Sequence, residues 1–91
     1  MASQPVWKME YLPRAVKTLR RMDRGDQALV VKRLERLACL DDPTSRCKAL
    51  QGPLTGLWRL RVADFRVGLD IRRGELLIVA VDVGHRSAVY R

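Results

Sequence analysis

The spacing of apolar residues changes once along this chain of 91 residues. Between residues 13 and 38, apolar side chains recur at the i, i+3, i+4 spacing of an amphipathic helix. From Trp58 onward they alternate with arginine and other polar residues, which is the period of a strand with one buried face. The order of these patterns predicts a small α+β domain, β-α-α-β-β-β, in which an N-terminal helical hairpin packs on one face of an antiparallel sheet.

Turn and cap residues set the expected bounds of these elements. Pro13 is suited to the first turn of a helix, and Asp26 is suited to cap a second one that Asp41-Asp42-Pro43 ends. Ala63-Asp64 predicts a tight connection between two strands. The expected elements are a strand over Val6–Tyr11, a helix over Pro13–Met22, and a second helix that runs from the cap Asp26 as far as Asp41-Asp42-Pro43. A long surface loop over 44–56, strands over 58–62 and 65–71, and an interior strand over Leu76–Val83 are expected to follow.

Chain length and residue types exclude several classes of protein. A chain of this size cannot divide its core, so residues 1–91 are expected to form one domain and not a multidomain enzyme. The longest apolar run, Leu76–Val81, is too short to cross a membrane, and the N-terminus lacks a secretory signal, so we expect a cytoplasmic protein. Cys39 and Cys47 are expected to be free thiols. With one histidine they are too few for a structural zinc site, and no metal or cofactor is expected.

The charge balance points to a polyanionic partner. Lysine and arginine number 18 against 10 acidic residues, which gives a net charge of +8 and a pI of about 10.5. Most of the basic residues are arginines, whose planar fork suits bidentate contact with phosphate or carboxylate. A GC-rich genome would also enrich arginine without any functional meaning, so the placement of the arginines has to decide.

The connection at Ala63-Asp64 fixes which side chains face each other. It places Arg61 opposite Arg66 and Arg59 opposite Gly68, all on the face that the helices leave uncovered. Like charges directly opposite each other destabilise a sheet, and a glycine lets a ligand approach the backbone. The arginines are therefore expected to surround an anion.

The C-terminal residues strengthen this interpretation. Residues 84–86 supply a histidine and an arginine, and Tyr90-Arg91 adds an aromatic ring and a further cation. Single-stranded RNA is commonly held by a basic surface with an aromatic side chain that stacks on a base. Two alternatives remain: the strand arginines are solvated side chains paired with Asp70 and Asp82, and Tyr90 fixes the chain end to the core.

Three segments resemble the RelE-type toxins of bacterial toxin–antitoxin pairs. Gly56–Val67 resembles their signature GLYRLRVGDYRV, and Val83–Arg86 with Val89-Tyr90 resembles their VGHR…VY ending. Lys48–Gly52 resembles their approach to the second strand, and the likeness covers nearly the whole chain. It implies a ribosome-dependent, metal-free endoribonuclease that cuts mRNA in the ribosomal A site, inhibits translation and is neutralised by a cognate antitoxin.

The resemblance also implies roles for individual residues. Arg59 and Arg61 match positions beside the scissile phosphate, and Arg66 matches the arginine that holds its charge. Arg86 matches the residue that protonates the leaving 5′ oxygen, and Tyr90 the ring that stacks on a base. The full expected set is Arg59, Arg61, Arg66, Arg86, Tyr90 and His85 for catalysis, and Lys48, Arg59, Arg61 and Arg91 for RNA binding.

One residue departs from the family pattern. Arg59 replaces the lysine proposed as general base in other members, and an arginine stays protonated in proteins. Arg59 is therefore expected to bind phosphate. His85 is the expected base, because an unperturbed histidine side chain has a pKa of about 6.5, and Asp82 and Asp64 are weaker candidates.

Two other functions share this fold. A ParE-like toxin would poison DNA gyrase by binding, and a catalytically weakened toxin would only bind its antitoxin. ParE-type chains usually lack the pair Arg86 and Tyr90, so the sequence favours the ribonuclease. In each case the expected protein partner is an antitoxin whose acidic or amphipathic segment wraps the helices and the basic sheet.

Overall fold

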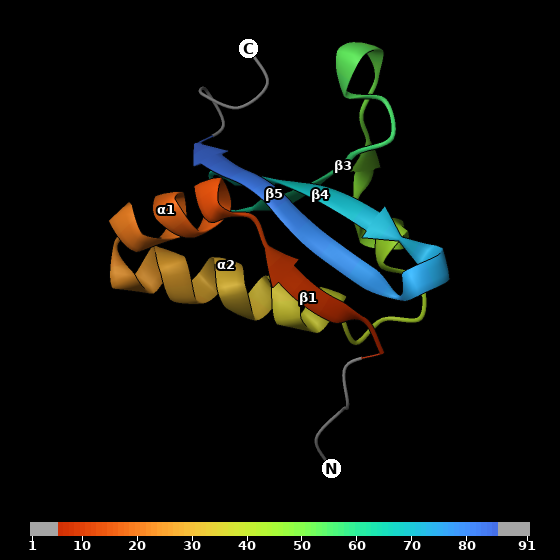
Figure 1. The fold of residues 1–91 in the computed structure, drawn as a ribbon. Helices are drawn as coiled ribbons and strands as arrows, with labels where there is room; N and C mark the ends of the chain where they lie inside the picture. The colour runs from red at the N-terminus through yellow and green to blue at the C-terminus, as the bar shows by residue number, and fades with distance from the viewer. Residues whose placement is uncertain (1–5, 86–91) are drawn as a thin grey trace.

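A computed structural model describes residues 6–85 and contains a helical hairpin and one sheet (Figure 1). Short 3-10 turns interrupt the connections between the longer elements. The elements in chain order are β1 (Lys8–Tyr11), α1 (Pro13–Arg21), α2 (Arg24–Leu37), η1 (Pro43–Arg46), β2 (Lys48–Ala49), η2 (Gly52–Leu54), β3 (Trp58–Val62), β4 (Phe65–Arg72), η3 (Arg73–Glu75) and β5 (Leu77–His85).

The sheet confirms the expected α+β class and adds two features to it. Its strand order is β1-β5-β4-β3-β2, so the last strand is interior, as predicted. β1 runs parallel to β5, whereas all other neighbours are antiparallel. A parallel pair needs a long connection, and here most of the chain separates the two strands. The segment expected to be only a surface loop, 44–56, contributes the short edge strand β2.

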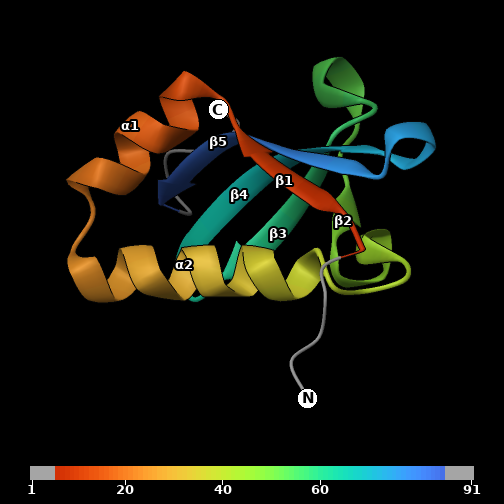
Figure 2. The same ribbon diagram turned by 60° about the horizontal axis from the view of Figure 1, so that its bottom comes forward.

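The helices cover one face of the sheet and enclose the core (Figure 2). α2 begins at Arg24, two residues before the expected cap at Asp26, and Asp23 precedes it without a side-chain cap. Val30 is fully buried, whereas its neighbour Leu29 is 40% exposed, although both were expected on the apolar side. The buried core comprises Trp7, Ala15, Leu19, Val30, Leu34, Leu37, Ala38, Leu60, Val62, Val67, Leu69, Ile78, Ala80 and Val83.

Both cysteines are free thiols, Cys39 and Cys47. Burial raises the pKa of Cys47 to about 11, and the nearby Asp42 carboxylate adds to this effect. The thiolate is the reactive form, so Cys47 is a poor nucleophile at neutral pH. No helix within residues 6–85 is long and apolar enough to cross a membrane.

Candidate nucleic-acid interface

The β3–β4 hairpin has the register that the sequence predicts. Ala63-Asp64 connects Val62 to Phe65, which pair with each other. Ala63 has a φ of 52°, the left-handed conformation that tight hairpin turns use. Further along the hairpin, Arg61 lies opposite Arg66, and Arg59 lies opposite Gly68.

These arginines lie on the face that the helices leave uncovered. Leu60 and Val62, which alternate with them on β3, are buried in the core under the helices. Side chains of a strand point to opposite faces in turn, so Arg59 and Arg61 point away from the core. β2 adds a further cation, since Lys48 pairs with Arg59. We call Lys48, Arg59, Arg61 and Arg66 the basic face.

No carboxylate among residues 6–85 forms an ion pair with the basic face. Asp70, a partner considered from the sequence, instead accepts a hydrogen bond from Arg72 at 2.9 Å. The Asp82 carboxylate accepts one from the backbone N–H of Val83 at 3.0 Å. The ion pairs of the described chain are Lys8–Glu10, Arg72–Asp70, Arg72–Glu75 and Arg73–Asp42. The facing pair Arg61 and Arg66 thus lacks protein counter-charge within the described residues.

A cleft of about 730 Å³ lies beside the basic face and shares Arg59 with it. Residues of the loop that carries η2 line one part of it, and this loop lies on the side of the sheet away from α2 (Figure 1). Gly68 and Asp82 lie across the sheet from Arg59, and Arg14 reaches the cleft from α1. We call this site the loop cleft. Its lining residues are Arg14, Leu50, Gln51, Pro53, Leu54, Leu57, Arg59, Gly68, Val81 and Asp82.

His85, the only histidine of the chain, does not lie on the basic face. His85 pairs with Phe65 at the end of β5, and the two rings meet edge to face with centroids 5.8 Å apart. Phe65 packs against the core, so His85 lies on the helix-facing side of the sheet, opposite to Arg66. The expected general base therefore lies on the other side of the sheet from Arg61 and Arg66. The predicted residues Arg86, Tyr90 and Arg91 lie outside the described residues.

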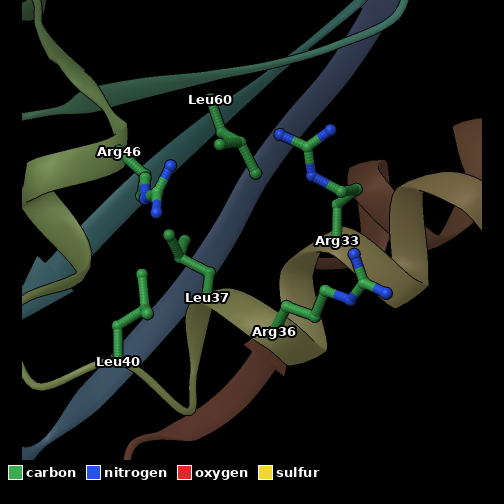
Figure 3. A pocket seen from close by; sticks show the side chains of 6 residues that line it. All are labelled: Arg33, Arg36, Leu37, Leu40, Arg46 and Leu60. Carbon is green, nitrogen blue, oxygen red and sulfur yellow. The ribbon is translucent and has the colours of Figure 1, made fainter.

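A second basic cleft, which the sequence did not indicate, lies on the helix-facing side. It has a volume of about 290 Å³ and a floor of Leu37, Leu40 and Leu60. Arg33 of α2 and Arg46 of η1 approach this floor from opposite sides (Figure 3). All of its arginines are exposed and without an ion-pair partner in the described part of the chain. We call the set Arg33, Arg36, Leu37, Leu40, Arg46 and Leu60 the helix cleft.

Solved structures of toxins share this fold. The RelBE2 toxin–antitoxin complex of Mycobacterium tuberculosis matches with a TM-score of 0.82 and 20% identity over 96% of this chain and 99% of that chain. A RelE–RelB complex of Pyrococcus horikoshii gives 0.75 and 20% over 92% and 99%. The intact E. coli RelBE complex gives 0.69 and 11% over 87% and 95%. At these identities the likeness establishes the fold alone.

Sequence comparison identifies the family. No curated protein sequence matches the chain. The model of the family described as ParE toxin of type II toxin–antitoxin system, parDE, matches residues 9–90, which is almost the entire chain. With this match and the RelE-like fold, the chain belongs to the ParE toxin family of type II toxin–antitoxin systems, within the RelE/ParE superfamily.

Proposed function

We propose that this toxin is a ribosome-dependent, metal-free endoribonuclease that cleaves mRNA. The observation that carries the proposal is the facing pair Arg61 and Arg66 on the uncovered side of the sheet. Like charges held opposite each other destabilise a sheet, and a bound phosphate would remove that cost. The neighbouring cations Lys48 and Arg59 lie on the same surface, so that it can contact several successive phosphates of an RNA strand.

The arrangement of arginines suits cleavage through the ribose 2′-hydroxyl. As the 2′ oxygen bonds to phosphorus, its proton passes to water, the bond to the 5′ oxygen breaks, and negative charge builds up on the phosphate oxygens in the transition state. Guanidinium groups fixed beforehand at that point stabilise the transition state more than the ground state. Arg61 and Arg66 are assigned this role, because strand pairing holds them side by side. Arg59 binds phosphate and is not the base, since arginine remains protonated.

The proposal extends the family resemblance to residues 86–91. Arg86 is assigned to protonate the leaving 5′ oxygen, Tyr90 to stack on a base, and Arg91 to bind the RNA. His85 receives no catalytic role here, because its ring lies against Phe65 on the helix-facing side. Rate acceleration then rests on positioning and on charge stabilisation by the arginines.

A second candidate function is inhibition of DNA gyrase by binding. The family match, which is to ParE toxins over residues 9–90, favours it. The same arginines would then contact an acidic protein surface or DNA and would carry out no chemistry. The two functions differ in product, since only the ribonuclease shortens mRNA.

A reconstituted translation reaction tests the proposal. We expect mRNA cleavage, mapped as new 5′ ends, with ribosomes present and none without them. Supercoiling by purified gyrase is measured in parallel with the same toxin preparation. Intact mRNA together with inhibited gyrase would favour the ParE activity, and intact mRNA with active gyrase would leave a toxin that only binds its antitoxin.

We further propose that the helix cleft receives an acidic amphipathic segment of the antitoxin. Its leucine floor is suited to an apolar side chain, and the surrounding arginines are suited to flanking carboxylates. Arg33→Glu combined with Arg46→Glu is expected to weaken antitoxin binding at least about tenfold, because each partner carboxylate then meets a like charge. Wild-type affinity should fall as salt is raised.

Surface binding measurements against the antitoxin encoded beside the toxin check this expectation. Lys17→Glu is the matched control, since Lys17 is an exposed cation of α1 outside the helix cleft. It undergoes the same reversal from +1 to −1, at one site where the double variant has two, and is expected to bind as wild type does. Equal affinity of the double variant and the control would contradict the assignment.

A further inference from the structure

We infer that the loop cleft binds one RNA base next to the phosphate held by the basic face, and that Asp82 selects guanine there. The inference rests on the proposed ribonuclease function and deepens it. It assigns a ligand to those residues of the loop cleft that have no role in phosphate binding by the basic face.

The strand register places a glycine between a cation and a carboxylate in the lining of the loop cleft. Arg59 on β3 pairs with Gly68 on β4, which pairs in turn with Asp82 on β5. Gly68 has no side chain of its own, and it is buried at the bottom of the cleft. A nucleotide in the cleft would lie over this glycine, with its phosphate toward Arg59 and its base edge toward Asp82.

Several apolar side chains line the cleft and can contact the faces of a bound ring. Leu50, Pro53, Leu54 and Leu57 line it from the segment around η2, and Val81 lines it from β5. Arg14 of α1 adds a second cation to the lining. Apolar side chains together with two cations suit a nucleotide, which combines a flat, poorly hydrated base with an anionic backbone.

A β-bulge aims Asp82 into the cleft. The register between β4 and β5 shifts at Gly68/Leu69, so Val81 is the extra residue and lines the cleft beside Asp82. Bulges are frequent next to active sites, where they redirect side chains. The hydrogen bond from the Val83 N–H to Oδ1 at 3.0 Å then fixes the orientation of the carboxylate.

The free acceptor sites of Asp82 discriminate between bases. A carboxylate has about four lone-pair sites, and the Val83 N–H occupies one of them. Guanine presents two adjacent donors, N1–H and the 2-amino group, which match a carboxylate. Uracil presents one N–H flanked by two carbonyl oxygens, which a carboxylate repels. A good bidentate contact discriminates by about 1–3 kcal/mol, so guanine should be preferred over uracil by at least about fivefold.

Cleavage profiles on a defined set of mRNAs test the inference. The mRNAs carry A, C, G or U at each position of a single A-site codon, and cutting rates are measured for wild type and Asp82→Asn on reconstituted ribosomes. We expect a guanine preference in wild type at one codon position and its loss in Asp82→Asn, because an amide cannot accept two hydrogen bonds from guanine in the same geometry.

Asp70→Asn is the matched control. Asp70 lies on the same sheet face as Asp82, but its carboxylate pairs with exposed Arg72 away from the loop cleft, so the base profile should stay wild type. Cleavage by wild type with the same profile in Asp82→Asn would overturn this inference alone. Absence of any cleavage by wild type would overturn the proposed function and the inference with it. Melting temperatures of both variants exclude unfolding as the cause of a changed profile.

Discussion

Arg66→Ala is expected to slow ribosome-dependent mRNA cleavage by about 100- to 1,000-fold, the usual cost of removing one charge-stabilising donor from a transition state. Arg66 is half-buried on β4 and faces Arg61 on β3. Its guanidinium is therefore held in place before the phosphate gains charge, which is the condition for differential stabilisation. Single-turnover cutting of one mRNA on stalled ribosomes measures the change directly.

Arg66→Ala is expected to lose activity without losing thermal stability. Removing Arg66 leaves Arg61 without a like-charged residue across the hairpin, so the melting temperature should stay equal or rise. Arg21→Ala serves as the control, because Arg21 is an exposed arginine at the end of α1 on a different part of the molecule. It is expected to cut at the wild-type rate. Full activity in Arg66→Ala would remove the basic face from the mechanism.

The β3–β4 hairpin was predictable residue by residue because its two strands have clean alternation and a short connection. Once Ala63-Asp64 is taken as the turn, a register with Leu60 and Val62 buried leaves only one placement for Arg59 and Arg61. β2 gave no such signal. β2 has only two residues, which is too short to show an alternating pattern. Its pairing with β3 also depends on how the chain turns through η2, and the spacing of apolar residues does not predict that turn.

Only the part of the candidate site that lies on the β3–β4 hairpin was predictable from the sequence. The loop cleft requires α1, the segment around η2 and the bulge in β5 to meet, and these contacts are long in sequence separation. The placement of His85 was within reach of the sequence. Val83 is buried, and because β5 continues past it, the residue two positions on shares its face. Because the expected strand ended at Val83, His85 fell outside it and was not assigned to the helix-facing side.

The integrity of the interface depends on the core beneath it, and Leu34→Ala tests this dependence. Leu34 is fully buried on α2 in the core cluster that also contains Leu60 and Val67, the residues that alternate with the arginines. Its truncation is expected to lower the free energy of unfolding by about 2–5 kcal/mol. Small domains have only about 5–15 kcal/mol in total, and a melting temperature lowered by about 10 °C or more should result.

Leu29→Ala separates burial from helix propensity in the same experiment. Leu29 lies on the same helix and undergoes the same change, but it is 40% exposed. Leucine and alanine have similar intrinsic helix propensities, so this variant should unfold within about 0.5 kcal/mol of wild type. Urea unfolding followed by circular dichroism gives both values. Equal losses in the two variants would mean that the burial of Leu34 against the sheet adds nothing to stability, and the basic face would then lack the rigid support that preorganised arginines require.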